Sequence, residues 1–194
     1  MIAFLKGKFV LKTPALVYVD VQGVGYEVQI SLHTYARIQD AEEGLLYTCL
    51  LIREDAHILY GFYDTAEKEM FLHLISVSGV GASTARMMLS YMKPNELANA
   101  IIQADTRTLE NIKGIGKKSA ERIVVELKDK LAKNPVETNN SALKHNTLHA
   151  DALNALIALG IGRNPADQAV QKVIKSEPST TSLEEVIKKA LKNL

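Results

Sequence analysis

The sequence predicts an α+β multidomain fold, with a small β-barrel first, a helical domain next and a three-helix bundle at the C-terminus. Ten of the eleven aromatic residues fall between Phe4 and Phe71, in a segment rich in β-branched residues, and this composition is typical of strands. From Thr65 onward, apolar residues recur at helical spacing instead. A polar and aperiodic stretch over 135–149 then separates a helical tail from the rest, as a flexible linker would.

The first domain, over 1–63, alternates strand-like runs with turn residues. Gly23-Val24-Gly25, Gly44 and Gly61 punctuate these runs as turns, bends or bulges. We expect a short helix over 32–38 and strands over 2–12, 15–20, 23–31, 45–53 and 56–63. Five short strands with one helical insert indicate a Greek-key β-barrel of the OB type.

The second domain, over 64–134, has the signals of five short helices. Phe71 and Leu74 fit the apolar face of the first helix, and Ala85 and Met88 fit that of the second. The later helices are expected to start at Pro94, at Asp105 or Thr106, and at Ser119, the last of them extending to Leu131.

The tail, over 150–194, is predicted to form a third domain. Gly160-Ile161-Gly162 and Pro178 interrupt its helical pattern. Helices are therefore expected near 150–160, 165–176 and 181–193. A helical bundle of this length is near the small limit of independent stability.

Composition excludes several classes of protein. The net charge is +1, so any nucleic-acid surface must be a local patch. Cys49 is the only cysteine, and His145 and His149 lack further ligands, so we expect no disulfide and no metal site. No run reaches the roughly 18 apolar residues of a membrane span, and the start at Met1 lacks a secretory signal. We therefore expect a cytoplasmic protein with no membrane partner.

Eight of the eleven glycines occur as Gly-x-Gly pairs, and two of these pairs lie in matching contexts 35 residues apart. Each context reads apolar-x-x-apolar-x-Gly-apolar-Gly-x-x-x-Ala-x-x-apolar. The first copy consists of Leu74, Val77, Gly79, Val80, Gly81, Ala85 and Met88, and the second of Leu109, Ile112, Gly114, Ile115, Gly116, Ala120 and Ile123.

This spacing predicts two helix-hairpin-helix motifs. The glycines allow a tight turn, the apolar residue between them fills the core, and Ala85 or Ala120 lets the two helices approach closely. Backbone N–H groups of the turn and of the next helix then face outward, which makes an anion site suited to a DNA phosphate. Two copies in tandem bind the duplex backbone without reading bases. The candidate DNA-backbone residues are Gly79, Gly81, Arg86, Gly114, Gly116, Lys117, Lys118 and Arg122.

A nucleotide-binding loop and a catalytic centre are not expected. Gly116-Lys117-Lys118-Ser119 is similar to the end of a P-loop, but that motif needs a glycine at position 111, where Asn111 stands. No Ser/His/Asp or Cys/His arrangement stands out. The sequence therefore predicts no cofactor and no enzymatic activity of its own.

Together these segments resemble the RuvA family, the Holliday-junction-binding subunits of the bacterial branch-migration complex. The resemblance covers essentially the whole chain and is carried by the paired hairpins together with Val21–Val28, Arg53–Ala56, Leu59–Phe62 and Lys118–Arg122. Its most specific segments are Arg53–Asp55 and Gly114–Arg122, taken together. It implies a homotetramer that holds an open four-way junction, either alone or with a second tetramer face to face. It also implies two protein partners, the hexameric ATPase RuvB, which the tail recruits, and the resolvase RuvC.

The resemblance assigns two further sets of residues. Glu54 and Asp55 match an acidic pin at the junction centre; without the resemblance they would be an ordinary solvated turn. The apolar residues that match the RuvB-binding positions of the tail are Leu156, Leu159, Ile161 and Leu191. Since any three-helix bundle needs apolar residues in its core, a core role for these four is an equal alternative. Ala82-Ser83 departs from the Pro-Lys that family members often have after the first Gly-x-Gly.

Two other functions fit a helix-hairpin-helix sequence. A DNA glycosylase carries one such hairpin, but its catalytic aspartate follows at a larger offset than that of Asp129, which lies 13 residues after Gly116. A non-catalytic module of a nuclease or repair scaffold would have no need of the N-terminal barrel or the tail. Preference for four-way junctions over duplex distinguishes RuvA-like binding from such a module.

Overall fold

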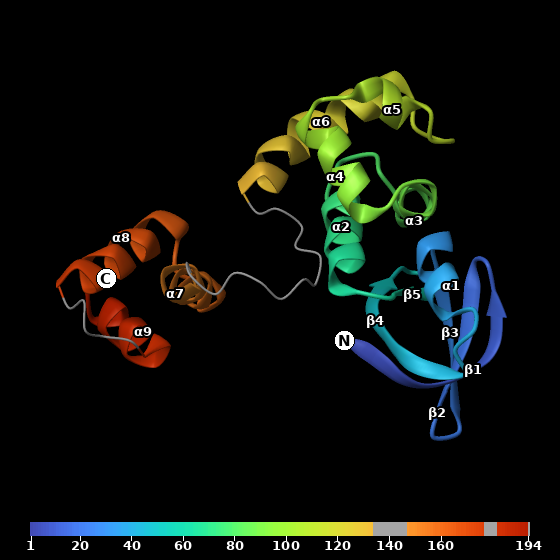
Figure 1. Ribbon diagram of the computed structural model, residues 1–194, viewed down its shortest axis with the longest axis horizontal. Helices are drawn as coiled ribbons and strands as arrows, with labels where there is room; N and C mark the ends of the chain where they lie inside the picture. Colours follow the sequence, from blue (N-terminus) through green and yellow to red (C-terminus); the bar gives the residue numbers. More distant parts are fainter. Residues whose placement is uncertain (134–146, 177–181, 194) are drawn as a thin grey trace. The chain divides into compact units, whose positions relative to one another are not determined.

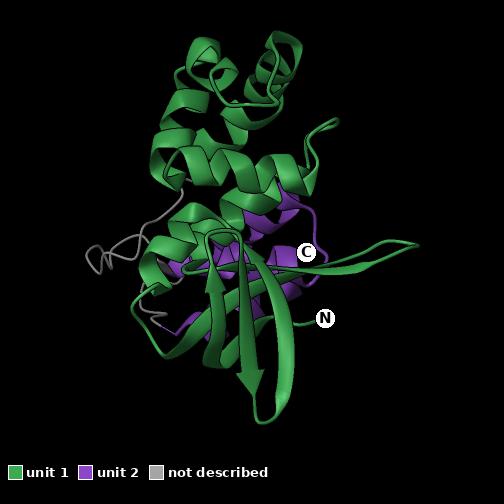
Figure 2. Cartoon of the chain, turned by 90° about the vertical axis from the view of Figure 1, so that its right-hand side faces the viewer, with its two compact units in different colours: residues 1–139 green, residues 140–194 purple. Residues whose placement is uncertain are grey.

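The computed structural model describes residues 1–133, 147–176 and 182–193 (Figure 1). The chain divides into two compact units, residues 1–139 and 140–194 (Figure 2), and each is described by itself. The linker expected over 135–149 lies outside the described residues up to residue 146, and its last three residues belong to a helix that begins at Thr147.

The strands form a closed barrel in the first unit. Their order around the barrel is β1-β2-β3-β5-β4, with antiparallel pairing throughout except for the parallel contact of β3 with β5. The elements in chain order are β1 (Phe4–Thr13), β2 (Leu16–Val21), β3 (Val24–Ile30), α1 (Leu32–Ile38), β4 (Glu43–Ile52) and β5 (His57–Phe62). The predicted OB-type barrel with its helical insert is confirmed.

The barrel core follows from alternation along the strands. In β2, Val17 and Val19 are fully buried, while Tyr18 between them is exposed, because successive side chains of a strand point to opposite faces. The buried residues that fill the barrel are Leu5, Phe9, Val17, Val19, Val28, Ile30, Ile38, Leu46 and Leu59.

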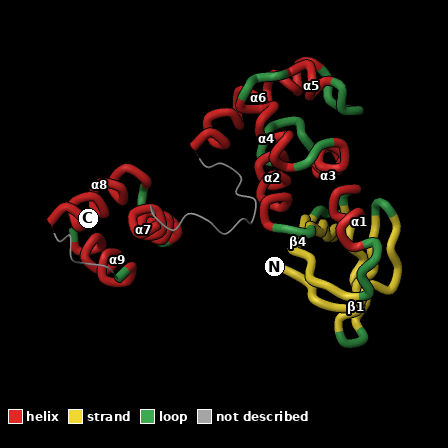
Figure 3. Tube along the Cα trace, viewed as in Figure 1, coloured by secondary structure: helices red, strands yellow, loops and turns green. Residues whose placement is uncertain are grey.

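The helical domain follows the barrel within the same unit. Its helices are α2 (Thr65–Ile75), α3 (Ala82–Tyr91), α4 (Pro94–Ile102), α5 (Thr106–Glu110) and α6 (Lys117–Lys133). Asp105 caps α5 by accepting a hydrogen bond from the Thr108 N–H, as expected, whereas α6 begins two residues before the predicted Ser119. Figure 3 shows the change from strands to helices along the chain.

A shared core joins the barrel to the helices. The rings of Tyr60 and Phe62 on β5 lie 5.0 and 4.9 Å from the ring of Phe71 on α2, measured between centroids. All three rings are buried, in one cluster that continues to the far end of α6 at Leu131. Burial of such aromatic surface is a large favourable term, so the barrel and the hairpins belong to one packed body.

A buried carboxylate adds a polar joint between the two domains. Glu67 on α2 is fully buried and accepts hydrogen bonds from the hydroxyls of Ser31 and Thr34, the latter at 2.6 Å. Both hydroxyls also accept a backbone N–H, Ser31 from Thr34 and Thr34 from Tyr63. Each hydroxyl therefore uses its proton on the carboxylate, and removal of that carboxylate would leave both protons without a partner.

The described helices of the tail pack as a bundle of their own. They are α7 (Thr147–Ala158), α8 (Arg163–Ser176) and α9 (Leu183–Lys192), and each contacts the other two. Their common core consists of Ala152, Leu153, Leu156, Ala166, Ala169, Val170, Val173, Val186 and Ala190. The predicted helical tail is confirmed. Over the parts of the chain that the structure describes, no helix combines the length and apolarity needed to cross a membrane.

The joint at Glu67 predicts a pH-dependent stability. Burial raises the pKa of the Glu67 carboxyl above its ordinary value, although the hydrogen bonds from Ser31 and Thr34 oppose the shift. A carboxyl with a raised folded pKa stabilises the fold below its unfolded pKa, about 4.3, and this contribution is lost as the pH rises through the folded value. We therefore expect the unfolding free energy of the wild type to fall relative to that of Glu67→Gln as the pH rises toward neutrality.

Denaturant titrations of the two proteins across this pH range measure the difference, and parallel profiles would contradict it. Glu67→Ala should lower the unfolding free energy by about 1–3 kcal/mol at the acidic end of this range, because it leaves the two buried hydroxyl protons unpaired.

Candidate nucleic-acid interface

The two glycine hairpins repeat the same backbone hydrogen bonds at the 35-residue offset. The paired bonds, each from a backbone N–H to a carbonyl oxygen, are Val77 to Leu74 and Ile112 to Leu109 at 3.1 Å, Val80 to Val77 and Ile115 to Ile112 at 3.0 Å, and Ala85 to Gly81 and Ala120 to Gly116 at 2.9 Å. The sequence repeat is therefore a repeat of backbone geometry.

The glycines of each pair have different tasks. Gly79 and Gly114 have φ of 89° and 93°, in the left-handed region that side chains disfavour. Gly81, by contrast, has an extended φ of −81° and precedes α3 as its N-cap. A Cβ added at Gly81 or Gly116 would meet no atom within 4 Å. The second glycine of each pair thus lies at an open surface that another molecule can approach closely.

The apolar residues of the repeat hold each hairpin together as predicted. Val80 and Ile115, between the glycines, are buried, and Ala85 and Ala120 on the following helices are fully buried. Larger side chains at these alanines would push the paired helices apart, since protein interiors are close-packed.

The hairpin ends present unpaired positive charge. Gly81 gives α3 no side-chain cap, so the first N–H groups of that helix have no capping side chain as a partner. At the second hairpin, Lys117 and Lys118 open α6 and are exposed, and Lys113 on the turn is exposed as well. Helix N-termini and lysine side chains both attract anions. Lys113 lies outside the predicted DNA-backbone set; the sequence indicates it only as one residue, with Arg86 and Thr84, that could compensate for the missing Pro-Lys contact of the first hairpin.

The two predicted arginines contact protein carbonyls. Arg86 on α3 donates from Nη1 to the Ala15 carbonyl oxygen in the β1–β2 turn, at 2.9 Å. Arg122 on α6 donates from Nη1 to the Ser78 carbonyl oxygen beside the first hairpin, at 3.0 Å. Sequence reasoning placed both side chains on DNA and missed these contacts, because each joins residues far apart in the chain.

The predicted pin residues lie at the tip of the β4–β5 hairpin. The Arg53 N–H donates to the Ala56 carbonyl oxygen at 2.8 Å and closes the turn. Glu54 and Asp55 occupy the two central positions, and both are exposed. The barrel therefore carries the carboxylates and the helical domain carries the hairpins, within one compact unit.

The four apolar positions of the tail separate into core and surface. Leu156 is fully buried in the bundle core and Ile161 is half-buried against it, whereas Leu159 is 64% and Leu191 43% exposed. Leu156 is therefore a core residue of the bundle, and its buried side chain is not accessible to a partner protein. Leu159 and Leu191 remain available as contact residues.

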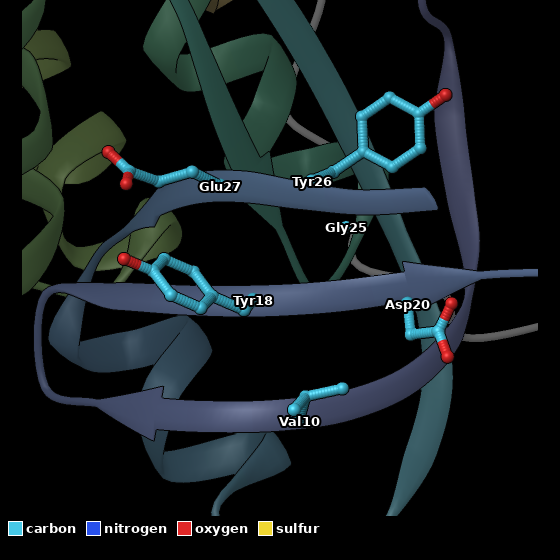
Figure 4. Close-up of a pocket in the computed structure, with 6 residues that line it drawn as sticks. All are labelled: Val10, Tyr18, Asp20, Gly25, Tyr26 and Glu27. Atoms are coloured by element: carbon cyan, nitrogen blue, oxygen red, sulfur yellow. The ribbon is translucent and has the colours of Figure 1, made fainter. Parts of the chain in front are cut away.

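A shallow hollow of about 200 Å³ lies on the barrel wall over β1, β2 and β3 (Figure 4). Tyr18 and Tyr26 contribute rings to it, but Asp20 and Glu27 line it as well. Strand faces of OB barrels often bind nucleic acid, yet two carboxylates would repel phosphates here. Within the described ranges, no group of three or more His, Cys, Asp or Glu side chains is arranged to hold a metal ion.

An OB-type barrel joined to a tandem helix-hairpin-helix domain, with a separate helical tail, defines the class of protein. The family models that match are the RuvA N terminal domain over residues 1–61, the SAM-like helix-hairpin-helix tandem over 71–129 and the RuvA C-terminal domain over 147–194.

Proteins of similar sequence match this chain along their full length. Three of them carry the name Holliday junction branch migration complex subunit RuvA. They come from Cytophaga hutchinsonii (45% identical over 197 residues, 99% of each chain), Flavobacterium psychrophilum (46% over 194 residues, all of both chains) and Bacteroides fragilis (44% over 202 residues, all of both chains). The chain belongs to the RuvA family.

The distinct tasks of the glycines predict distinct effects of adding one methyl group. Gly114→Ala places a side chain in the left-handed region and should lower the unfolding free energy by about 1–2 kcal/mol. Gly116→Ala should leave stability nearly unchanged but weaken duplex binding several-fold, because the methyl group lies where a phosphate would approach. Gly25→Ala is the control, since Gly25 is equally open but lies on the barrel. Thermal unfolding and duplex titration measure both effects, and wild-type affinity in Gly116→Ala would exclude a close phosphate at this hairpin.

Proposed function

We propose that the protein binds four-way DNA junctions as a tetramer, holds them open and recruits the RuvB motor for branch migration in recombination and repair. The observation that carries this proposal is the repeated hairpin, whose two copies have the same backbone hydrogen bonds and an open second glycine. The names of the similar proteins, all subunits of a Holliday junction branch migration complex, support the choice of ligand.

The hairpins suit a ligand that is recognised by its backbone. Each offers backbone N–H groups and open glycine surface, and the second adds the exposed Lys117 and Lys118. Such contacts position a duplex without reading its sequence, which is what a protein that must work at any junction requires. The net charge of the whole chain is only +1, so a DNA-binding surface must be a local patch such as this one.

A tetramer would match the four arms of the junction. Cyclic assemblies repeat one contact around an axis, so each arm would meet the same pair of hairpins. Four protomers would bring eight carboxylates, from Glu54 and Asp55, to the centre of the binding face. Continuous duplex laid across that centre would be repelled, whereas an open junction spreads its phosphates around it. The pin would thus favour junctions by weakening the competing complex.

The pin predicts a change in selectivity. Glu54→Gln combined with Asp55→Asn should raise affinity for linear duplex and change junction affinity less, so the junction-to-duplex affinity ratio should fall. The fall should be larger at low salt, where charges are screened least. Titration of both DNAs at two salt concentrations measures the ratio. A suitable control is Asp40→Asn with Glu42→Gln, which removes two exposed carboxylates elsewhere on the barrel. An unchanged ratio at both salt concentrations would exclude an electrostatic pin, and equal wild-type affinity for both DNAs would exclude junction specificity.

The motor activity is assigned to another polypeptide. The sequence has no P-loop, so we propose a non-catalytic subunit, with ATP hydrolysis in RuvB and resolution in RuvC. The tail offers RuvB several exposed apolar side chains, those of Ile157, Leu159, Leu183 and Leu191. Its core is separate from that of the first unit, so the tail can hold a partner without using the hairpins.

The exposed leucines predict a loss of motor recruitment. Leu159→Glu combined with Leu191→Glu should abolish stimulation of RuvB ATPase activity on junction DNA, because two charges would be buried at the contact. Junction binding by the variant should equal that of the wild type. Asn154→Glu, at an exposed position of α7, the helix that Leu159 follows, is the control. Wild-type stimulation of RuvB by the double variant would remove this surface from the RuvB contact.

A further inference from the structure

Arg122 reaches from the second helix-hairpin-helix copy to the turn of the first. Its Nη1 donates to the Ser78 carbonyl oxygen at 3.0 Å, across 44 residues of sequence. The same nitrogen lies 3.7 Å from the point where a Cβ on Gly79 would be. The guanidinium therefore lies against the left-handed residue on which the first turn depends.

The repeat shows that a hairpin of this kind can form without such a contact. Position 87, which is 35 residues before Arg122, holds an exposed methionine, Met87. The second hairpin nevertheless makes the same backbone bonds as the first, at the same distances. The Arg122 contact is thus an addition to the first hairpin and not a requirement of its fold.

DNA binding by the first hairpin depends strongly on the exact position of its backbone. Ala82, Ser83 and Thr84 follow Gly81, so no cation lies in the first turn of α3. The next one, Arg86, is bonded to the Ala15 carbonyl oxygen of the barrel. This hairpin must hold a phosphate chiefly by backbone N–H groups, and hydrogen bonds of that kind depend steeply on distance and angle.

We propose that Arg122 is a positioning residue that fixes the first hairpin relative to the second, so that both meet the phosphates of one duplex arm together. This inference rests on the proposed DNA-binding function. When two binding sites are held at the correct spacing on a rigid body, both can contact the same duplex at once and the affinity rises. This gain in affinity is lost when the spacing is wrong. Arg122 suits the task because its planar fork donates in a fixed direction, whereas a lysine is a flexible point charge.

Two substitutions separate a positioning role from direct phosphate binding. Arg122→Met introduces the residue found at the equivalent position of the first copy, and Arg122→Lys keeps the charge but loses the fork. Amide hydrogen exchange of the free protein reports hairpin placement at Val80, and the Ile115 amide, with the same 3.0 Å bond, is the internal reference. Duplex titration measures binding, and Lys118→Met is the control for loss of an exposed cation.

Both Arg122 variants should exchange the Val80 amide faster, leave the Ile115 amide unchanged and bind duplex several-fold more weakly. Lys118→Met should leave both amides unchanged and lower the slope of log affinity against log salt by about one unit. Unchanged Val80 exchange, with affinity restored by Arg122→Lys, would make Arg122 an ordinary phosphate ligand. Faster exchange at unchanged affinity would equally overturn the proposal. If the wild type bound no DNA, the proposed function would fail, while the exchange data would still decide whether Arg122 holds the hairpin.

Discussion

A reversal of the chain between two helices, made at Gly79 and again at Gly114, is the constraint on which the helical domain depends. Both residues lie in the left-handed region, so the turn needs only a few residues and the next helix begins against the previous one. That proximity is possible because Ala85 and Ala120 have small side chains, and both are fully buried. The same short turn leaves the first N–H groups of the next helix facing solvent. Packing and anion attraction therefore both come from one backbone geometry.

The hairpins are useful only if their position on the rest of the unit is fixed, and the joint with the barrel supplies this. Aromatic packing around Phe71 connects β5 to α2 within one buried cluster. The bonds of Ser31 and Thr34 to Glu67 add direction, because hydrogen bonds restrict angle as well as distance. The Leu32 N–H, which donates to the Ser90 hydroxyl at 3.0 Å, adds a third connection on the α3 side. Apolar packing, which has no directional preference, and a few directional hydrogen bonds together fix the position of the hairpins relative to the barrel.

Sequence patterns predicted those parts of the molecule that depend on local spacing. Strand alternation and turn residues gave the barrel, and the Gly-x-Gly repeat gave both hairpins with their buried Val80 and Ile115. Contacts between distant segments were missed, because local spacing does not determine where the long side chain of Arg86 or Arg122 ends. Spacing also did not separate Leu156 from Leu159, since α7 is apolar over much of its surface and its core face is set by α8 and α9. The role of the pin came from family resemblance alone, since an exposed Glu-Asp turn has no distinguishing local signal.

The two hairpins have the same backbone geometry but differ in charge. In the proposed function, this difference gives them different roles in DNA binding. The second, with Lys117 and Lys118 exposed, attracts phosphate over a distance and should contribute most of the salt dependence, because its lysines displace counterions. The first has no cation in its helix turn and acts mainly through N–H groups at short range. Its contribution depends more on geometry than on ionic strength, so it needs the connections that the chain provides to Ser78 from α6 and to Ala15 from α3. A nearly neutral chain can thus combine charge-driven capture at one hairpin with rigid placement at the other.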